Sequence, residues 1–269
     1  MSKEELLAKK EYGFNDLVEI IKILRAPGGC PWDAKQTHES IKKNLIEETY
    51  EVIEAVNKDD KELLCDELGD LLMQVVFHAQ METEAGVFNF DDVADGVCKK
   101  IVERHPHLFG EITVSGVEDV LTNWDAIKKK TKGQKTTADS MFSVPRELPA
   151  LMRASKLQKK AADIGFDWPD VSGALDKLEE EIAELRAAIA NNDKANVNEE
   201  LGDLLFSAVN VSRFVKVDAE ESLTAASDKF LARFTEVERL ANERNIDMMN
   251  SSLEELDALW DEVKARSKK

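Results

Sequence analysis

The chain has 269 residues, of which 43% are hydrophobic and 33% are charged, and this length favours two domains over one. Its formal net charge of −18 argues against a broad surface for nucleic acid polymers or anionic membranes, because both would be repelled. Glycine and proline are scarce and Ala, Glu, Lys and Leu dominate, so the composition predicts an all-α globular protein.

The N-terminal segment lacks the apolar core of a signal peptide, and no stretch approaches the roughly 20 apolar residues of a membrane span. Cys30, Cys65 and Cys98 are odd in number and form no C-x-x-C pair, which fits reduced thiols better than a disulfide frame or a zinc site. We therefore expect a soluble, cytoplasmic protein.

The first half begins with a predicted helix over residues 15–25, which Pro27, Gly28 and Gly29 end. A turn follows around Trp32, which we interpret as a core anchor. Two longer helices are predicted next, over residues 40–56 and 61–83, with a short polar turn between them.

The helix over 61–83 carries an apolar stripe at helical spacing, made of Leu64, Leu68, Leu71, Leu72, Val75 and Val76. Glu67 and Asp70 lie at the margin of this stripe, so we expect them to border the core. Glu48 and Glu51 form a similar i, i+3 pair on the preceding helix. Antiparallel packing of the two helices would bring the four carboxylates level with one another.

Residues 131–149 are polar and end in two prolines, so we predict a linker there between domains over 1–130 and 150–269. The second half then repeats the first, with a helix over 151–163 and a turn around Trp168, again interpreted as a core anchor. A second acidic set follows, each member 133 positions after its counterpart: Glu181, Glu184, Glu200 and Asp203.

Four converging carboxylates repel one another unless a cation binds or some are protonated. Oxygen ligands from Glu and Asp suit Mg²⁺ or Mn²⁺, which accept phosphate oxygens as further ligands. Acidic helix faces are usually only solvated, but repetition of the whole quartet beside an apolar stripe favours a metal site. A di-iron centre would normally supply E-x-x-H, and none of the four histidines has Glu three residues before it. P-loop and Rossmann fingerprints are also absent.

Two further patterns recur after each quartet. Lys100-x-x-x-Arg104 returns as Lys229-x-x-x-Arg233, and Trp124-Asp125-x-x-Lys128 returns as Trp260-Asp261-x-x-Lys264. Lys and Arg on one helical face can hold phosphates, and an aromatic ring can stack on a base. Each pattern alone is common on helix surfaces, but acids, bases and Trp in the same order favour a nucleotide site.

With these motifs the chain resembles the MazG-type nucleoside triphosphate pyrophosphohydrolases, an all-α group that shares E-E-x-x-E and E-x-x-D. The resemblance covers nearly the full length. It rests on Gly29-Cys30-Pro31-Trp32-Asp33, Glu47 to Tyr50, Glu67 to Leu72, Arg104-His105-Pro106-His107 and Leu148-Pro149-Ala150-Leu151-Met152-Arg153.

The resemblance implies two tandem MazG-type helical-bundle domains, and a homodimer whose subunits complete the bundles. It also implies hydrolysis of ribo- and deoxyribonucleoside triphosphates, ATP included, to the monophosphate and pyrophosphate, with Mg²⁺ or in its place Mn²⁺. In two-domain members the C-terminal domain carries the activity.

Carried over to this sequence, the resemblance implies metal ligands at Glu181, Glu184, Glu200 and Asp203, with a second copy at Glu48, Glu51, Glu67 and Asp70. Glu180 joins the four C-terminal acids as a catalytic candidate, for orienting or deprotonating water. The implied nucleotide-binding residues are Lys177, Glu180, Glu181, Glu184, Asn196, Glu199, Lys229, Arg233, Trp260 and Lys264.

Two departures separate the halves from each other and from the family. Asn196 stands where family members carry a basic residue, which weakens one expected phosphate contact. Lys177 corresponds by the same offset to Asn44, so the first half lacks a lysine that the second has and the second is the favoured active site. One alternative is a non-catalytic helical interaction dimer whose acids only keep it soluble or bind a basic partner. A second keeps the fold and the enzyme class but acts on deoxynucleotides such as dUTP or dCTP.

Overall fold

The structure is a computed structural model that describes residues 2–131 and 133–266. Every regular element in these two ranges is a helix, and no strand occurs in them. The predicted all-α fold is therefore confirmed. None of the described helices is both long enough and apolar enough to cross a membrane.

The chain divides into two compact units, residues 1–128 and 129–269. The first contains α1 (Lys3–Leu7), α2 (Phe14–Arg25), the 3-10 helix η1 (Asp33–Lys35), α3 (His38–Asn57), α4 (Lys61–Ala85), α5 (Phe90–Arg104), α6 (Pro106–Phe109) and most of α7 (Val117–Thr131). The second contains α8 (Thr137–Phe142), α9 (Ala150–Ala162), α10 (Val171–Ala190), α11 (Lys194–Phe214), α12 (Ala219–Glu243) and α13 (Leu253–Arg266).

The unit boundary falls in the last turn of α7, close to the predicted end of the first domain at residue 130, and the exact domain limits stay a prediction. The predicted linker over 131–149 is not wholly irregular, since it contains α8, which packs on α9. A reciprocal cap starts α8: the Thr136 backbone N–H donates to Asp139 Oδ2 at 2.8 Å, and the Asp139 N–H donates to Thr136 Oγ1 at 3.0 Å.

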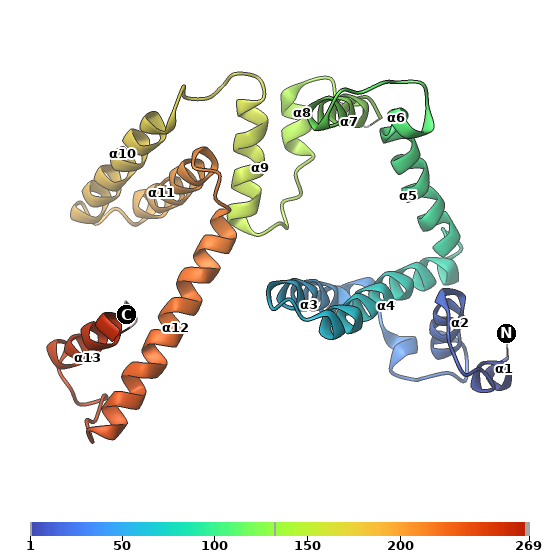
Figure 1. The fold of residues 1–269 in the computed structure, drawn as a ribbon, viewed down its shortest axis with the longest axis horizontal. Coiled ribbons are helices and arrows are strands. Elements are labelled where there is room, and N and C mark those ends of the chain that lie inside the picture. The colour runs from blue at the N-terminus through green and yellow to red at the C-terminus, as the bar shows by residue number, and fades with distance from the viewer. Residues whose placement is uncertain (1, 132, 267–269) are drawn as a thin grey trace. The chain divides into compact units, whose positions relative to one another are not determined.

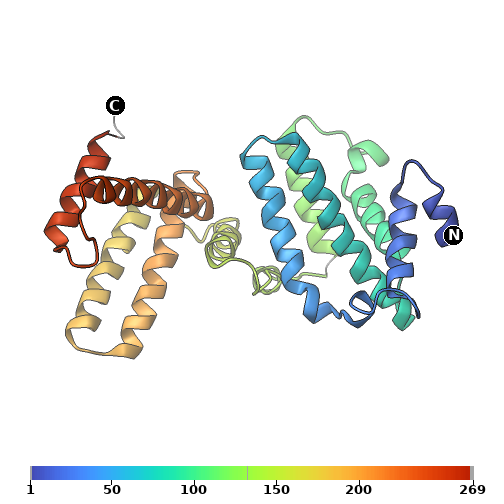
Figure 2. The same cartoon turned by 90° about the horizontal axis from the view of Figure 1, so that it is seen from below.

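Each unit is built around one helical hairpin, α3–α4 in the first and α10–α11 in the second (Figure 1). Figure 2 shows the two helices of each hairpin side by side along their length. The predicted helices over 40–56 and 61–83 match α3 and α4 to within about two residues, the usual uncertainty of helix ends.

The two hairpin turns have the same construction. Asp59 and its counterpart Asn192 adopt the left-handed conformation, with φ of 53° and 54°. The following aspartates, Asp60 and Asp193, cap the next helix with their side chains. Asn and Asp tolerate left-handed backbone better than most residues. The duplicated turn therefore fixes the register in which both acidic helix pairs meet.

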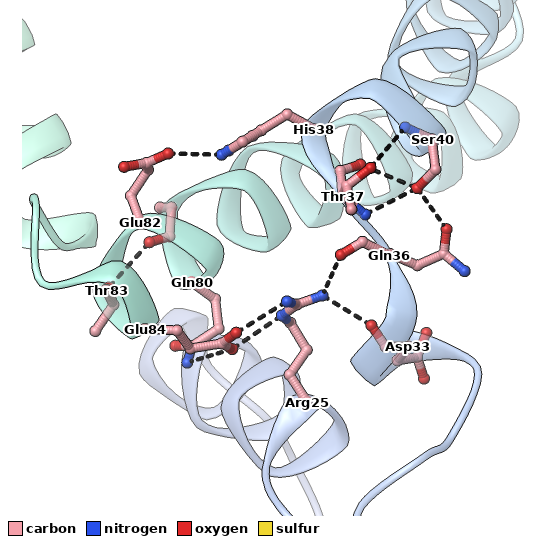
Figure 3. A network of polar contacts seen from close by, with 11 residues as sticks. Arg25, Asp33, Gln36, Thr37, His38, Ser40, Gln80, Glu82, Thr83 and Glu84 are labelled. Atoms are coloured by element: carbon pink, nitrogen blue, oxygen red, sulfur yellow. Dashed lines mark hydrogen bonds and ion pairs between the residues drawn. The ribbon is translucent and has the colours of Figure 1, made fainter.

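In the first unit, a small core joins α2, α3 and α4 through Ile21, Ile41, Val76, Phe77 and Met81. Arg25 lies next to this core, with its guanidinium carbon 5.2 Å from the centroid of the Phe77 ring. Figure 3 shows its polar contacts. Its guanidinium makes two bonds of 2.9 Å to the Glu84 carboxylate and also donates to the carbonyls of Asp33 and Gln36. One buried arginine thus ties α2, η1 and α4 together.

In the second unit, the buried cluster joins α12 and α13 through Val237, Leu240, Ala241, Leu259 and Val263. Helix α9 contacts both α11 and α12. Arg213 on α11 forms a bidentate pair with Asp167 at 2.6 and 2.7 Å, holding the loop after α9. The α10–α11 hairpin is thereby anchored at its α11 end.

The interpretation of the two tryptophans as core anchors is wrong for Trp32, which is 65% exposed. Trp168 is 39% exposed and packs its ring against Gly173 at the start of α10. The apolar stripe of α4 is also only partly buried, because Leu68, Leu72 and Val75 are exposed while Val76 lies in the core. The α3–α4 hairpin therefore presents apolar side chains on its outer face.

Candidate metal centre and nucleotide site

The predicted acids of the second half converge as expected from antiparallel helices. Glu181 and Glu184 on α10 and Glu200 on α11 each offer a carboxylate oxygen, and the three oxygens lie within 4.8 Å of one another. Glu181 is buried, Glu200 is half-buried and Glu184 is exposed. The fourth predicted ligand, Asp203, lies outside this closest group but near enough for its charge to act on Glu200.

The first half forms the matching group from Glu48 on α3 and Glu67 and Asp70 on α4, again within 4.8 Å. Glu51 is the member outside the closest three, although it is near enough for its charge to add to the effect of burial in raising the pKa of Glu48. The buried Gln74 side chain donates to Glu48 Oε1, at 3.4 Å. Each hairpin therefore holds three acids in a tight cluster with the fourth beside it.

Burial and mutual repulsion act on these acids in the same direction. Desolvation, followed by the charge of neighbouring carboxylates, raises the pKa of Glu48, Glu67 and Glu200 above the usual value. A bound cation would relieve this repulsion and replace lost hydration with carboxylate oxygens. The donor set consists entirely of hard oxygen ligands, so it fits a divalent cation such as Mg²⁺ or Mn²⁺.

Lys177 forms ion pairs with two acids of the C-terminal hairpin. Its ammonium lies 2.8 Å from Glu180 Oε1 and 2.7 Å from Glu181 Oε1. Hydrogen bonds to Glu180 and then Glu181 raise the pKa of Lys177 well above its usual value. Asn44 stands at the equivalent place on α3, so the N-terminal cluster has no such cation on its helix.

Asn196 and Glu199 lie on α11 before Glu200. The Asn196 backbone N–H is one of the donors that Asp193 caps, so this residue sits in the first turn of the helix. The Asn196 side chain is half-buried one turn before Glu200, and Glu199 is exposed. Their place beside the acids is compatible with the predicted contact to nucleotide.

The basic and aromatic residues gather on a different helix pair, α12 and α13. Arg233 lies over the Trp260 ring, 5.9 Å from its centroid, while Lys229 and Lys264 are exposed. The first unit repeats the pair, with Arg104 over Trp124 at 5.3 Å. The side chain of Asp125, part of the W-D-x-x-K pattern, lies outside the described residues.

Sequence reasoning missed two aromatic residues of this second group. Phe230 packs against Trp260 with ring centroids 5.4 Å apart, and Phe234 lies 6.0 Å from Phe230. The i, i+4 spacing of the two phenylalanines next to Lys229 was the available signal. Phe230 is 59% exposed, so this patch offers an accessible aromatic surface beside two cations.

Within a single protomer, the acidic cluster and the basic residues of α12 and α13 form separate groups. Within the described residues, no hydrogen bond or ion pair connects Glu181, Glu184 or Glu200 with the basic residues of α12 and α13. The predicted site is therefore present as two groups: acids with Lys177 on the α10–α11 hairpin, and Arg233 with Trp260 on the α12–α13 pair.

Comparison with known proteins identifies the family to which both acidic hairpins correspond. The family described as MazG nucleotide pyrophosphohydrolase domain matches residues 36–109 and 171–237, so one match covers each acidic hairpin. The chain belongs to the MazG family. The two matched segments include all eight predicted metal ligands, four in each MazG domain.

Two similar proteins extend over almost the whole MazG chain. A nucleoside triphosphate pyrophosphohydrolase of Escherichia coli K12 is 43% identical over 92% of this chain and 95% of its own length. The nucleoside triphosphate pyrophosphohydrolase/pyrophosphatase MazG of Thermotoga maritima is 42% identical over 95% of this chain and 98% of its own. A nucleoside triphosphate pyrophosphohydrolase of Mycobacterium tuberculosis matches 56% of this chain at 39% identity.

These matches confirm the predicted family, and with it an enzyme of the nucleoside triphosphate pyrophosphohydrolase class. The non-catalytic interaction dimer is correspondingly disfavoured.

Proposed function

We propose that this MazG protein hydrolyses ribo- and deoxyribonucleoside triphosphates to the monophosphate and pyrophosphate with Mg²⁺, mainly at the α10–α11 hairpin. The observation that carries the proposal is the convergence of Glu181, Glu184 and Glu200, with Glu181 buried. Three carboxylates this close repel one another, and the single ammonium of Lys177 balances only part of their charge, so a divalent cation would stabilise the group.

The proposed ligands are Glu181, Glu184, Glu200 and Asp203, with Mn²⁺ as an alternative ion. Bound there, the metal would supply Lewis-acid stabilisation of the triphosphate and a more acidic water. The N-terminal quartet has the same donor types and is proposed as a metal-competent second copy. Lys177, which Asn44 replaces in that copy, favours the C-terminal hairpin as the main active site.

The side chains around the metal ligands have separate proposed roles. Glu180 is exposed next to Glu181 and can accept a proton from the attacking water or orient it. Lys229 and Arg233 are suited to hold the phosphates and to stabilise negative charge on the leaving pyrophosphate. The Trp260 ring, with Phe230 beside it, is suited to stack on the base.

We also propose that the active form is a homodimer. The outer face of α11 exposes Leu201, Leu205 and Phe206, at 47%, 51% and 43%. In α4 the positions equivalent to the two leucines, Leu68 and Leu72, are exposed as well. Apolar faces repeated on both hairpins are suited to burial against a second copy, which would complete the helical bundles.

The reaction can be tested with a panel of ribo- and deoxyribonucleoside triphosphates. We expect pyrophosphate and the monophosphate as first products in Mg²⁺ or Mn²⁺, and no turnover once EDTA removes the ion. Orthophosphate as the sole first product would show a phosphatase instead. Absence of turnover together with absence of a metal-dependent thermal shift would support the non-catalytic dimer.

A further inference from the structure

Lys177 occupies an unusual place for a residue expected to contact a nucleotide. Its ammonium bonds at 2.7 Å to Glu181 Oε1, and the Glu181 side chain is only 5% exposed. Ion pairs one helical turn apart are usually solvated and contribute little to stability. Here one partner is buried within a cluster of acids, so Lys177 neutralises a carboxylate that water barely reaches.

The carboxylate that Lys177 neutralises is also a member of the candidate metal centre. Glu181 groups with Glu184 and Glu200 within 4.8 Å. A divalent cation that uses Glu181 must therefore compete with the ammonium for the same carboxylate. The lysine side chain is long, flexible and 36% exposed, so it can leave Glu181 without unfolding α10.

The N-terminal hairpin provides a natural comparison. Asn44 stands at the position of Lys177, and Glu48, the counterpart of Glu181, accepts a long hydrogen bond from the neutral Gln74 amide and makes no ion pair among the described residues. The two clusters therefore have equivalent acids but differ in whether a lysine on the same helix pairs with one of them.

We propose that Lys177 acts as a tethered cation: its ammonium, attached to α10 through the side chain, occupies the Glu181 carboxylate of the C-terminal metal centre until a divalent ion binds. This inference rests on the proposed function. When the divalent ion takes over Glu181, the ammonium is released and becomes available to the negatively charged triphosphate. Metal and nucleotide then strengthen each other's binding at this site, because the ion frees the lysine that the phosphates attract.

The inference makes an unusual prediction for the metal alone: removing a predicted nucleotide-binding residue tightens metal binding. We expect Lys177→Gln to bind Mn²⁺ about tenfold more tightly than the parent without nucleotide. Lys177→Arg keeps the charge and should keep the weaker affinity. The reciprocal change Asn44→Lys should weaken Mn²⁺ binding at the N-terminal hairpin by a similar factor.

The full-length protein is used, and Mn²⁺ binding is followed by electron paramagnetic resonance of the free ion. Each site is measured alone by silencing the other: Glu67→Gln with Asp70→Asn leaves the C-terminal centre, and Glu200→Gln with Asp203→Asn leaves the N-terminal one. Repeating the titrations with a non-hydrolysable triphosphate analogue measures the coupling. The analogue should strengthen Mn²⁺ binding at the C-terminal centre, and Lys177→Gln should reduce that gain.

The possible failures are distinguishable. If the parent binds no Mn²⁺ at either hairpin, the proposed function fails. If the C-terminal centre binds Mn²⁺ but Lys177→Gln leaves its affinity unchanged or weaker, the tethered cation is excluded and the metal-dependent reaction stands. Asn44→Lys tests the same competition at the N-terminal hairpin. If Lys177→Gln fails to fold, the Mn²⁺ affinity of Asn44→Lys still decides whether a lysine at this position weakens metal binding.

Discussion

Glu181 is buried and His78 is half-buried, and the partners of these two ionisable residues differ in kind. Glu181 is compensated by the ammonium of Lys177 and belongs to the candidate metal centre. His78 lies on α4, C-terminal to Glu67 and Asp70 of the first acidic cluster, and shares a hydrogen bond with His38. The other ring nitrogen of His38 contacts Glu82, as Figure 3 shows. We propose that Glu181 contributes to metal binding, and we expect His78 to contribute to stability.

The two histidine rings meet edge to edge. Their Nδ1 atoms are 2.7 Å apart while the ring planes differ by only 2°. If His38 Nε2 donates to Glu82, neutral His38 accepts from His78 Nδ1–H. The His78 Nε2 atom is buried without a partner in the described residues, so a second proton there would be poorly solvated.

We therefore expect the free energy of unfolding to fall in mild acid. Burial, and then the neighbouring His38, lower the pKa of His78 below 6.5 in the folded protein. Below about pH 6.5 the unfolded chain binds more protons, so stability decreases as pH falls through this value towards the folded pKa. Urea midpoints at about pH 7.5 and 5.5 should differ more for the parent than for His78→Gln. An equal difference in both proteins would contradict this role of His78.

At the scale of elements, the acidic hairpins were the part of the fold that sequence predicted best. Their helices follow from local periodicity, and their turns from residues that cap or tolerate left-handed backbone, so little tertiary information is needed. Even α8 carried a readable signal in Thr136 and Asp139. The spacing of Phe230 and Phe234 was visible in the sequence, but the exposure of Trp32 and the contact of Phe230 with Trp260 could not be read, because both depend on tertiary packing.

The candidate site also has features that local sequence predicts and features that depend on tertiary packing. The level placement of the acids followed from helix geometry, since i, i+3 pairs equally far from a tight turn must meet. The i, i+4 spacing predicts the contact of Lys177 with Glu181. It does not predict that Glu181 is buried, which is what makes this contact stronger than an ordinary surface ion pair. The separation of Arg233 and Trp260 from the acids depends on how α12 packs on α9, which no local pattern encodes.

The hairpin turns make a direct prediction for stability. Asp60 Oδ1 accepts from two backbone N–H groups at 3.1 and 3.0 Å, and Asp193 Oδ1 accepts from one at 3.2 Å. Replacing either aspartate with Ala should lower the free energy of unfolding by about 1 kcal/mol, measured by urea unfolding. Asn keeps the cap and should cost much less. An Asn variant as unstable as the Ala variant would show that charge, not capping, matters.

At the scale of the whole molecule, the chain is a duplication whose copies have kept their acids and exposed apolar faces. Leu205 on α11 is 51% exposed and corresponds to Leu72 on α4. If these faces are buried in a homodimer, Leu205→Lys should shift the protein towards monomer in sedimentation equilibrium. Leu7→Lys, at a residue 80% exposed on α1, is the matched control and should stay dimeric. A monomeric parent, or an unaffected Leu205 variant, would contradict the proposed dimer.

We propose that the C-terminal acids carry most of the hydrolysis, a claim that paired variants of the two hairpins can distinguish from its opposite. Pyrophosphate release from a nucleoside triphosphate with Mg²⁺ is followed by phosphorus nuclear magnetic resonance. Glu200→Gln with Asp203→Asn should reduce the rate by at least about 10³-fold, as expected when a metal ion central to catalysis is lost. The equivalent pair, Glu67→Gln with Asp70→Asn, should keep most of the parent rate. The reverse pattern, or full turnover in the C-terminal pair, would contradict the claim.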